Sequence, residues 1–230
     1  MSESHISVLT PESLTSGFTE IEGRMRSFDT EDVFGLAGNA IEHVYVVQSG
    51  LVSLVVQLRF GHQIETGMAG PGGLVGASAL AGATWPNVFV AQSPVTAWEM
   101  KTKDFVAAVK QNLKLHDLAF RHVQWLMVQA QQTAACHGAH HLEARLATWL
   151  LRAHDLTGWT EIPFTQDTIS KLLGVKRPSV SMVMAELHRE KIVSYSRGNI
   201  RLADRHRIEE RACECFHVLR ARREEILEAG

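Results

Sequence analysis

A helix–glycine–helix stretch followed by a basic hairpin, from Thr165 to Arg201, constrains this chain more than any other part of its sequence. The first helix is expected over residues 166–173, because Thr165 can cap its amino end and apolar residues recur at helical spacing. Gly174 follows at the point where a helix commonly ends on a residue with left-handed backbone. Val175 can then fill the corner before the next helix.

The second helix divides its residues between two faces. Its apolar face is formed by Val180, Val183, Met184 and Leu187. Its opening turn presents Lys176, Arg177, Ser179 and Ser181 on the other face. Pro178 is tolerable there, because the first turn of a helix has no partner for the missing N–H. This division suits a recognition helix that docks its apolar face on its own domain and meets bases and phosphates with its first turns.

A short hairpin follows the second helix. Residues 192–196 and 199–202 read as strands, and Arg197-Gly198 forms the turn between them. An ordinary two-helix corner beside a surface hairpin is the alternative interpretation, but the order of glycine turn, basic helix start and basic hairpin favours a winged helix-turn-helix. The residues expected to contact DNA are Lys171, Lys176, Arg177, Ser179, Ser181, Arg197 and Arg201.

Charge is distributed unevenly along the 230 residues. Residues 1–101 hold four Lys and Arg against ten Asp and Glu, whereas the remaining 129 residues hold 19 against 15. An acidic half joined to a basic half is typical of a sensor attached to a polyanion-binding domain. The three cysteines, the polar amino terminus and the lack of a long apolar run indicate a cytoplasmic protein without a disulfide framework or a membrane span.

The first half of the chain reads as short strands separated by glycines. Strands are expected over residues 43–47, 50–56, 88–91 and 95–100. The run from Tyr45 to Val52 resembles the turn-glycine hairpin of cyclic-nucleotide-binding folds, with Gly50 at the turn. A short helix is expected near residues 12–17. Many short strands with glycine turns predict a β-roll or jelly roll.

A helical stretch follows from Thr102 to about Ala139, with a break near Asn112. A heptad seam runs along it through Leu113, Phe120, Met127 and Ala134, beside His116, Val123, Ala130 and His137. Packing of this helix on its own domain is the alternative interpretation. The small alanines near its end would permit the helices of two chains to approach closely.

The segment from Gln166 to Ile192, together with the wing, resembles the DNA-binding domain of the Crp–Fnr family of transcription regulators. The similarity is greatest to proteobacterial members with an Arg-Pro-Ser-Val recognition helix and a Cys-x-Cys near the end, here Cys213 and Cys215. The resemblance implies an α+β chain in three parts: a cyclic-nucleotide-binding-like β-roll (1–101), a long dimerisation helix with a hinge (102–139) and a winged helix-turn-helix domain (140–230). It also implies a homodimer that binds double-stranded DNA and works with RNA polymerase.

The effector pocket departs from this family pattern. Cyclic-nucleotide binders hold the ribose with a Glu and the cyclic phosphate with an Arg–Ser/Thr step. Here Ala77 stands at the first position, and Pro86 and Asn87 stand at about the second. A cyclic phosphate needs a cation or several donors. No cyclic nucleotide is therefore expected, and the cofactor or small-molecule effector is left unknown.

The recognition helix departs from the family pattern as well. In the family, the residue three after the turn glycine commonly contacts guanine, which assigns base reading to Arg177. Pro178 and Met182 stand where the family has a Glu and a second Arg. The operator is therefore expected to differ from the family's usual TGTGA or TTGAT half-sites.

The junction between the long helix and the C-terminal part carries Cys136, His137, His140 and His141. Thiolates and imidazoles at short spacing can ligate zinc or a similar metal, and a thiol can sense oxidation, but the same residues can also simply pack and cap helices. Cys136 and His140 are therefore candidate sensor residues, with no metal assigned. Gly138 is expected to be the hinge that brings the recognition helices one DNA turn apart.

A last helix is expected from Arg205 to about Leu227, with Asp204 as its N-cap and both Cys213 and Cys215 inside it. Two residues apart on a helix, the two thiols would point about 200° away from one another. That arrangement is poor for a shared metal, so the pair is interpreted as structural.

The function favoured by these observations is a dimeric, DNA-binding transcription regulator. One alternative is a redox- or metal-responsive regulator that senses through Cys136 and its neighbouring histidines, and another is a cyclic-nucleotide adaptor that does not bind DNA. An enzyme is not expected, because the sequence has no nucleophile–base pair, phosphate-binding glycine loop or His-Glu-x-x-His motif.

Overall fold

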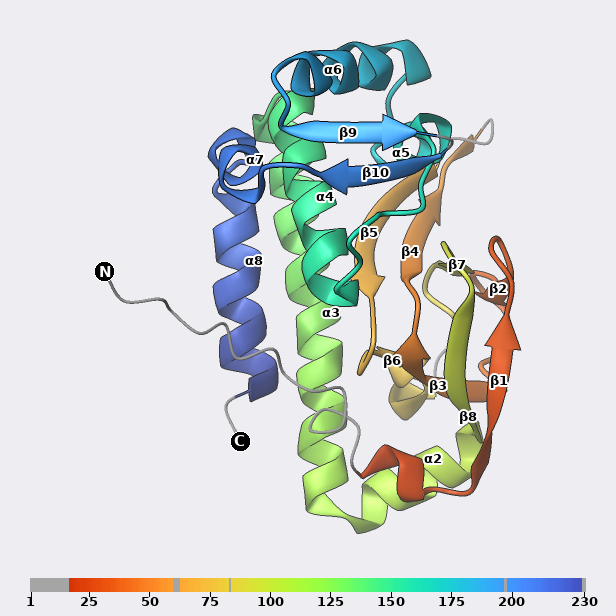
Figure 1. Cartoon of the computed structure of the whole chain (residues 1–230). Coiled ribbons are helices and arrows are strands. Elements are labelled where there is room, and N and C mark those ends of the chain that lie inside the picture. Colours follow the sequence, from red (N-terminus) through yellow and green to blue (C-terminus); the bar gives the residue numbers. More distant parts are fainter. Residues whose placement is uncertain (1–16, 60–62, 83, 197, 229–230) are drawn as a thin grey trace.

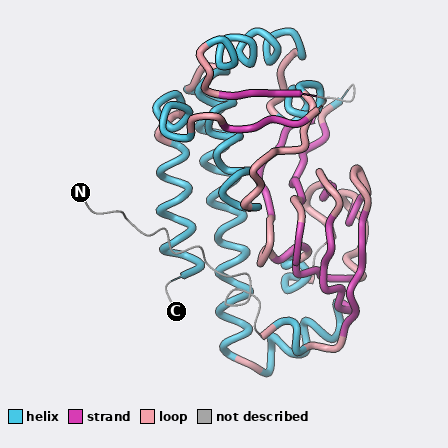
Figure 2. The backbone as a smooth tube through the Cα atoms, in the orientation of Figure 1, coloured by secondary structure: helices cyan, strands magenta, loops and turns pink. Residues whose placement is uncertain are grey.

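The computed structural model describes residues 17–59, 63–82, 84–196 and 198–228. A long helix, α3 (Leu113–Ala139), runs along the molecule with a β-roll on one side and helix α8 (Cys215–Arg223) on the other (Figure 1). Helix α6 (Arg177–Arg189) and a two-stranded hairpin lie together at one end, as the backbone trace also shows (Figure 2). Among the described residues, no helix is long and apolar enough to cross a membrane.

The β-roll consists of two antiparallel four-stranded sheets, in the orders β1-β8-β3-β6 and β2-β7-β4-β5. Its strands are β1 (Gly23–Phe28), β2 (Val33–Gly35), β3 (His43–Ser49), β4 (Val52–Gln57), β5 (Gln63–Ala69), β6 (Leu74–Val75), β7 (Val88–Ala91) and β8 (Val95–Lys101). Short 3-10 helices, η1 (Phe18–Glu20) and η3 (Ala77–Ala81), accompany them. Buried apolar side chains between the sheets form the core of the roll.

The four predicted strands are confirmed as β3, β4, β7 and β8, whereas β1, β2, β5 and β6 were not expected. All but the last residue of β1 are exposed, so this edge strand lacks the apolar alternation that marks a strand. The predicted Gly50 hairpin is wrong, because β3 and β4 belong to different sheets and Gly50, at φ 87°, turns the chain between them. The helix expected near residues 12–17 falls almost entirely outside the described residues.

The predicted break at Asn112 is confirmed. Helix α2 (Thr102–Gln111) ends there, and the Asn112 side chain caps α3 by accepting hydrogen bonds from the backbone N–H groups of Lys114 and Leu115, at 3.0 and 3.4 Å. An asparagine side chain is well suited to this role, because it satisfies donors that the first helical turn leaves free.

The C-terminal part packs helices and a hairpin around one apolar core. Its elements are α4 (Leu142–Thr157), α5 (Gln166–Leu172), α6, β9 (Val193–Ser196), β10 (Asn199–Leu202), α7 (Arg205–Arg211), α8 and the π-helical turn η4 (Glu224–Glu228). The Asp204 side chain caps α7, as expected, by accepting from the N–H of Arg207 at 3.0 Å.

The single helix predicted from Arg205 to about Leu227 is wrong. The chain leaves the helix after Arg211, is extended at Ala212 (ψ 154°), and re-enters a helix at Cys215. The break is stabilised by tertiary contacts, because Cys213 is buried and its N–H donates to the Thr148 hydroxyl on α4 at 3.3 Å. Local periodicity carries no information about such a contact.

Candidate nucleic-acid interface and hinge

Helices α5 and α6 form the predicted helix-turn-helix. The Thr165 hydroxyl accepts from the N–H of Thr168 at 3.1 Å and so caps α5. The turn passes through Gly174, whose φ of 65° is left-handed, and α6 then begins with Arg177 and Pro178. Val180, Val183, Met184 and Leu187 are buried in the C-terminal core, as the apolar pattern predicted. The opposite face of α6 is therefore the face available to a partner.

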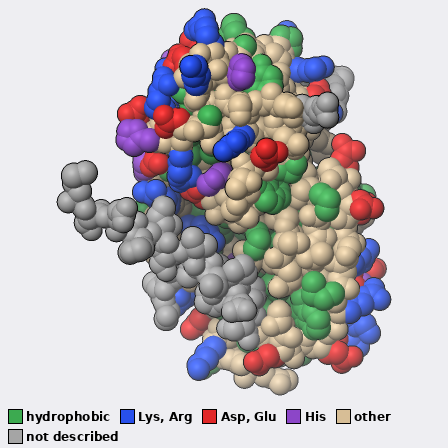
Figure 3. Space-filling view, in the orientation of Figure 1, with side chains coloured by type: hydrophobic (Ala, Val, Ile, Leu, Met, Phe, Trp, Pro, Cys, Tyr) green, Lys and Arg blue, Asp and Glu red, His purple; other side chains and the backbone are tan. Residues whose placement is uncertain are grey.

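The opening turn of α6 presents its cationic residues to solvent. Lys176 and Arg177 are exposed, whereas Ser179 and Ser181 are half-buried. The Ser181 hydroxyl donates to the Gln166 side-chain carbonyl at 2.6 Å, so it joins the two helices of the motif. Lysine and arginine side chains lie on this end of the molecule, with acidic and histidine side chains among them (Figure 3).

Two of the remaining predicted contacts, Lys171 and Arg201, lie on α5 and β10. Arg201 is exposed on β10, and Arg197 lies outside the described residues. Lys171 on α5 is exposed but pairs with Asp167 at 2.9 Å, which raises the pKa of Lys171 and lowers the pKa of Asp167. Lys171 must therefore give up this partner, or share it, to contact a phosphate.

Three features of this surface were not predicted. Met182 is 69% exposed in the middle of the outward face of α6, and Tyr195 is 39% exposed on the wing strand β9. Arg145 on α4 donates to the backbone carbonyl of Leu173 and braces the turn before Gly174. The helical register could have placed Met182 on the outward face, but no sequence signal indicates the bond from Arg145.

The junction of α3 and α4 differs in detail from the expected hinge. Gly138 is helical, and the chain changes direction at His140 and His141, whose backbones are extended. Helix α3 ends at Ala139, as predicted, and the change of direction follows Gly138 by two residues. Movement at this junction stays a prediction.

Cys136 and His140 lie beside the two cysteines of the Cys-x-Cys. Sγ of Cys136 is 3.5 Å from Sγ of Cys213, and Sγ of Cys215 is 3.6 Å from Nδ1 of His140. The expectation that Cys213 and Cys215 point apart is wrong, because Cys213 lies in the break between α7 and α8 rather than in a helix.

The surroundings of this cluster shift several pKa values. Hydrogen bonds from Cys136 and Thr148 lower the pKa of Cys213 to about 5, and the same partnership, with burial, raises the pKa of Cys136. Burial and the neighbouring Arg145 lower the pKa of His137 to about 4. His137 is therefore neutral near pH 7.

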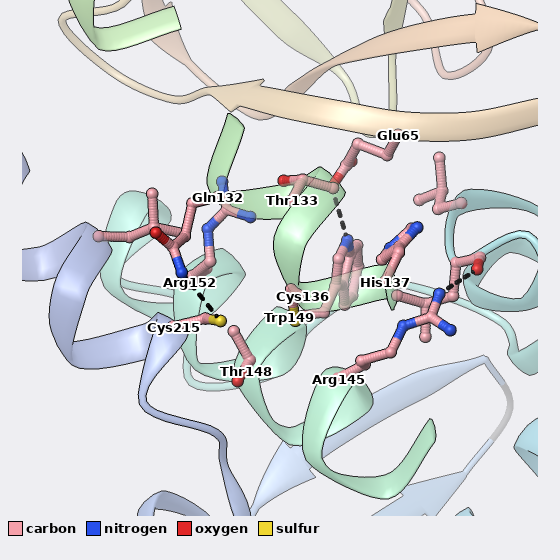
Figure 4. Close-up of a pocket in the computed structure, with 13 residues that line it drawn as sticks. Glu65, Gln132, Thr133, Cys136, His137, Arg145, Thr148, Trp149, Arg152 and Cys215 are labelled. Carbon is pink, nitrogen blue, oxygen red and sulfur yellow. Dashed lines mark hydrogen bonds between the residues drawn. The ribbon is translucent and has the colours of Figure 1, made fainter. Parts of the chain in front are cut away.

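A buried polar network joins the β-roll to α3 and α4, and Figure 4 shows its bond between Glu65 and Trp149. Glu65 of β5 accepts from Trp149 Nε1 at 2.9 Å and from the Ser53 hydroxyl. Arg152 donates to Gln129 at 2.6 Å, and Gln129 bonds to both the N–H and the carbonyl of Met68. Burial raises the pKa of Glu65 to about 7, although Arg152 and the two hydrogen bonds oppose the shift.

Two known domain families match the chain. The cyclic nucleotide-binding domain matches residues 25–112, and the Crp-like helix-turn-helix domain matches residues 144–211. The two occur in the order in which the structure presents the roll and the helix-turn-helix. The chain has the domains and fold of the Crp–Fnr transcription regulators.

Solved structures share this Crp–Fnr fold over most of the chain. FixK2 from Bradyrhizobium japonicum superimposes with a TM-score of 0.75 at 18% identity, covering 84% of this chain and 98% of FixK2. A CRP-family regulator from Thermus thermophilus gives 0.70 at 22% identity, covering 81% and 96%. The c-di-GMP-responsive regulator CLP of Xanthomonas campestris gives 0.64 at 15% identity, covering 83% and 98%. No curated protein matches the chain in sequence.

Apolar and neutral residues occupy the three positions at which the sequence departs from the cyclic-nucleotide-binding pattern. Ala77 is buried at the start of η3, Pro86 is exposed, and Asn87 is half-buried. Trp85 is buried and fills the space beside Gly35, where a Cβ atom would clash with the indole ring.

Proposed function

We propose that the chain acts as a homodimeric transcription regulator that inserts α6 into the major groove of a two-fold symmetric operator. The observation that carries this proposal is the opening turn of α6, where exposed Lys176 and Arg177 stand beside the amino end of a helix whose opposite face is buried. A helix amino terminus carries partial positive charge, which favours phosphate.

Within this proposal Arg177 reads a base, and Lys171, Lys176, Ser179, Arg197 and Arg201 contribute contacts to the phosphate backbone. Ser181 stays among the proposed backbone contacts, and its hydroxyl also donates to Gln166, which joins α6 to α5. Arg can pair bidentately with guanine, whereas lysines neutralise phosphates without reading sequence.

The proposal is tested with DNA selected by the wild-type protein from a randomised pool. Arg177→Ala should weaken binding to that DNA by roughly 1–3 kcal/mol and relax the preference at one position of each half-site. Arg189→Ala is the matched control, because it removes the same charge from the exposed carboxyl end of α6, where Arg189 pairs with Glu186. Equal losses of affinity in Arg177→Ala and Arg189→Ala would contradict the role of Arg177. If the wild-type protein selects the family's usual half-site, the prediction that Pro178 and Met182 change the operator is wrong.

Phosphate contacts have a separate signature. Lys176→Ala should weaken binding to all DNA sequences by the same factor. It should also reduce the slope of log affinity against log salt concentration by about one. An unchanged slope would remove Lys176 from the interface.

We also propose that the effector, if the roll binds one, is not a cyclic nucleotide. The support is the neutral character of Ala77, Pro86 and Asn87, since a cyclic phosphate needs a cation or several donors. Calorimetric titration with cyclic AMP and cyclic GMP should show no binding, and saturable binding of either would overturn this part. A role with RNA polymerase stays a prediction.

A further inference from the structure

We infer that Cys136, His140, Cys213 and Cys215 form a binding site for a single zinc ion. The donor atoms of these four residues all lie within 4.8 Å of one another. They come from two places far apart in the sequence: the last turn and end of α3, and the α7–α8 break with the first residue of α8.

The spacing suits a tetrahedral ion. Zinc binds thiolate sulfur at about 2.3 Å and imidazole nitrogen at about 2.0–2.1 Å, so neighbouring ligand atoms lie roughly 3.5–3.8 Å apart. The Cys136–Cys213 sulfur pair is separated by 3.5 Å, and the Cys215 sulfur and His140 Nδ1 by 3.6 Å. Three thiolates and one imidazole are a common ligand set of structural zinc sites.

The surroundings resemble the outer shell of a metal site. His140 points its other nitrogen, Nε2, at the Glu214 carboxylate, 3.1 Å away, which would orient the ring and strengthen Nδ1 as a ligand. Gln132 Nε2 lies 3.1 Å from the Cys215 sulfur, and the Thr148 hydroxyl lies 3.1 Å from the Cys213 sulfur. Both groups can donate to thiolates.

Charge and burial also agree with a bound cation. Three thiolates, a neutral imidazole and a divalent ion carry a net charge of −1, and the guanidinium groups of Arg145 and Arg152 act electrostatically on these cysteines. The three cysteines are buried. Four protein ligands in a closed setting leave no open position for substrate, so the site would be structural rather than catalytic. Binding would release the thiol protons to solvent.

A zinc ion here would tie the end of α3 to the α7–α8 break and, through Thr148, to α4. It would thereby fix the junction between the long helix and the helix-turn-helix. The inference does not depend on DNA binding, so the two can fail separately.

The test uses the full chain without a histidine tag, purified under reducing conditions. We expect about one zinc per chain by elemental analysis. Replacement by cobalt should give a thiolate-to-cobalt charge-transfer band and the intense visible bands of a tetrahedral ion. Cys213→Ser and Cys215→Ser should lose the metal, whereas His141→Ala, which changes an exposed neighbouring histidine outside the cluster, should keep it.

Glu214→Gln probes the site without removing a ligand. Competition with a chromophoric chelator should show zinc affinity lowered about 10-fold or more, with stoichiometry retained. The inference would be overturned if the wild-type protein takes up no zinc and gives no cobalt band. It would also be overturned if Cys136 and Cys213 form a disulfide in the reduced preparation, or if Cys215→Ser keeps its full metal content.

Discussion

Gly174 meets two separate constraints at the turn of the helix-turn-helix. Its φ of 65° is strained for any residue with a side chain, and a Cβ atom there would lie 2.9 Å from Cγ1 of Ile64 on β5. The first constraint is local and follows from helix termination. The second arises because the β-roll packs against α5, a contact between segments far apart in the sequence.

Gly174→Ala should therefore destabilise the protein by more than Gly158→Ala. Gly158 has nearly the same φ, 68°, but no atom lies within 4 Å of its Cβ position among the described residues. Left-handed strain alone costs about 1–2 kcal/mol, and Gly158→Ala should show that cost in urea unfolding. The excess at Gly174 should disappear in the Ile64→Ala background. An equal cost at both glycines would mean that the roll does not press on the turn.

At the scale of elements, the Glu65 network holds β5 against α4. A carboxyl group buried beside Trp149 keeps its proton more readily than one in water, because burial penalises the charged form. The hydrogen bonds from Trp149 and Ser53 and the charge of Arg152 act in the opposite direction but do not cancel the burial.

The raised pKa of Glu65 predicts a pH-dependent stability. Between its ordinary value of 4.5 and its folded value of about 7, the folded state binds more protons than the unfolded state. The stabilisation is thus fully present below pH 4.5 and is lost as pH rises to about 7, by at most about 3.5 kcal/mol at roughly 1.4 kcal/mol per pKa unit.

Glu65→Gln should remove this dependence while leaving a carbonyl to accept from Trp149. His137, with its pKa lowered to about 4, contributes a slope of the opposite sign, since its stabilisation is lost as pH falls. The free energy of unfolding in urea should therefore be measured for wild type and Glu65→Gln at a series of pH values, and the difference between the two should be compared. Glu161→Gln, at an exposed position, is the control and should leave the wild-type profile unchanged. Parallel profiles for wild type and Glu65→Gln would refute the assignment.

At the scale of the whole molecule, α3 carries an apolar stripe with no cover within the described chain. Leu113 is 80% exposed, Phe120 53% and Met127 54%, and these three residues are spaced one heptad apart. Val123 lies beside them and is 38% exposed. The buried residues of α3, including Leu115, Ala119 and Trp125, occupy the opposite side, against the roll and the C-terminal helices.

Phe120→Glu should convert a dimer to a monomer in sedimentation velocity experiments, because it places a charge within the stripe that a second copy would cover. Operator affinity should fall with it, since half-sites about 34 Å apart need two recognition helices held together. Lys114→Glu is the control, because it reverses a charge at an exposed position of the same helix outside the heptad series. This variant should sediment with the same mass as the wild type. A monomeric wild type would contradict the proposed dimer.

The helix-turn-helix could be predicted from the sequence because its determinants are local. A cap at Thr165, a left-handed glycine at 174 and apolar residues at helical spacing each act within a few positions, and the structure confirms all three. The wing strands and the break at Asn112 follow from the same kind of signal. The helical spacing of the apolar residues predicted which residues of α6 face outward. It did not predict the hydrogen bond between Ser181 and Gln166.

Contacts across the chain were decided only by the tertiary structure. Cys136 and Cys213 are 77 positions apart and meet because α7 breaks where Cys213 reaches Thr148, a break that no helical period announces. Glu65 acquires its raised pKa from burial in the folded chain, and Gly174 acquires its close neighbour from β5. The sequence by itself determined the helix-turn-helix and the capped break at Asn112, because backbone propensity and capping are short-ranged. Which side chains share a buried site depends on how those segments pack, because burial and donor geometry exist only once distant elements are in contact.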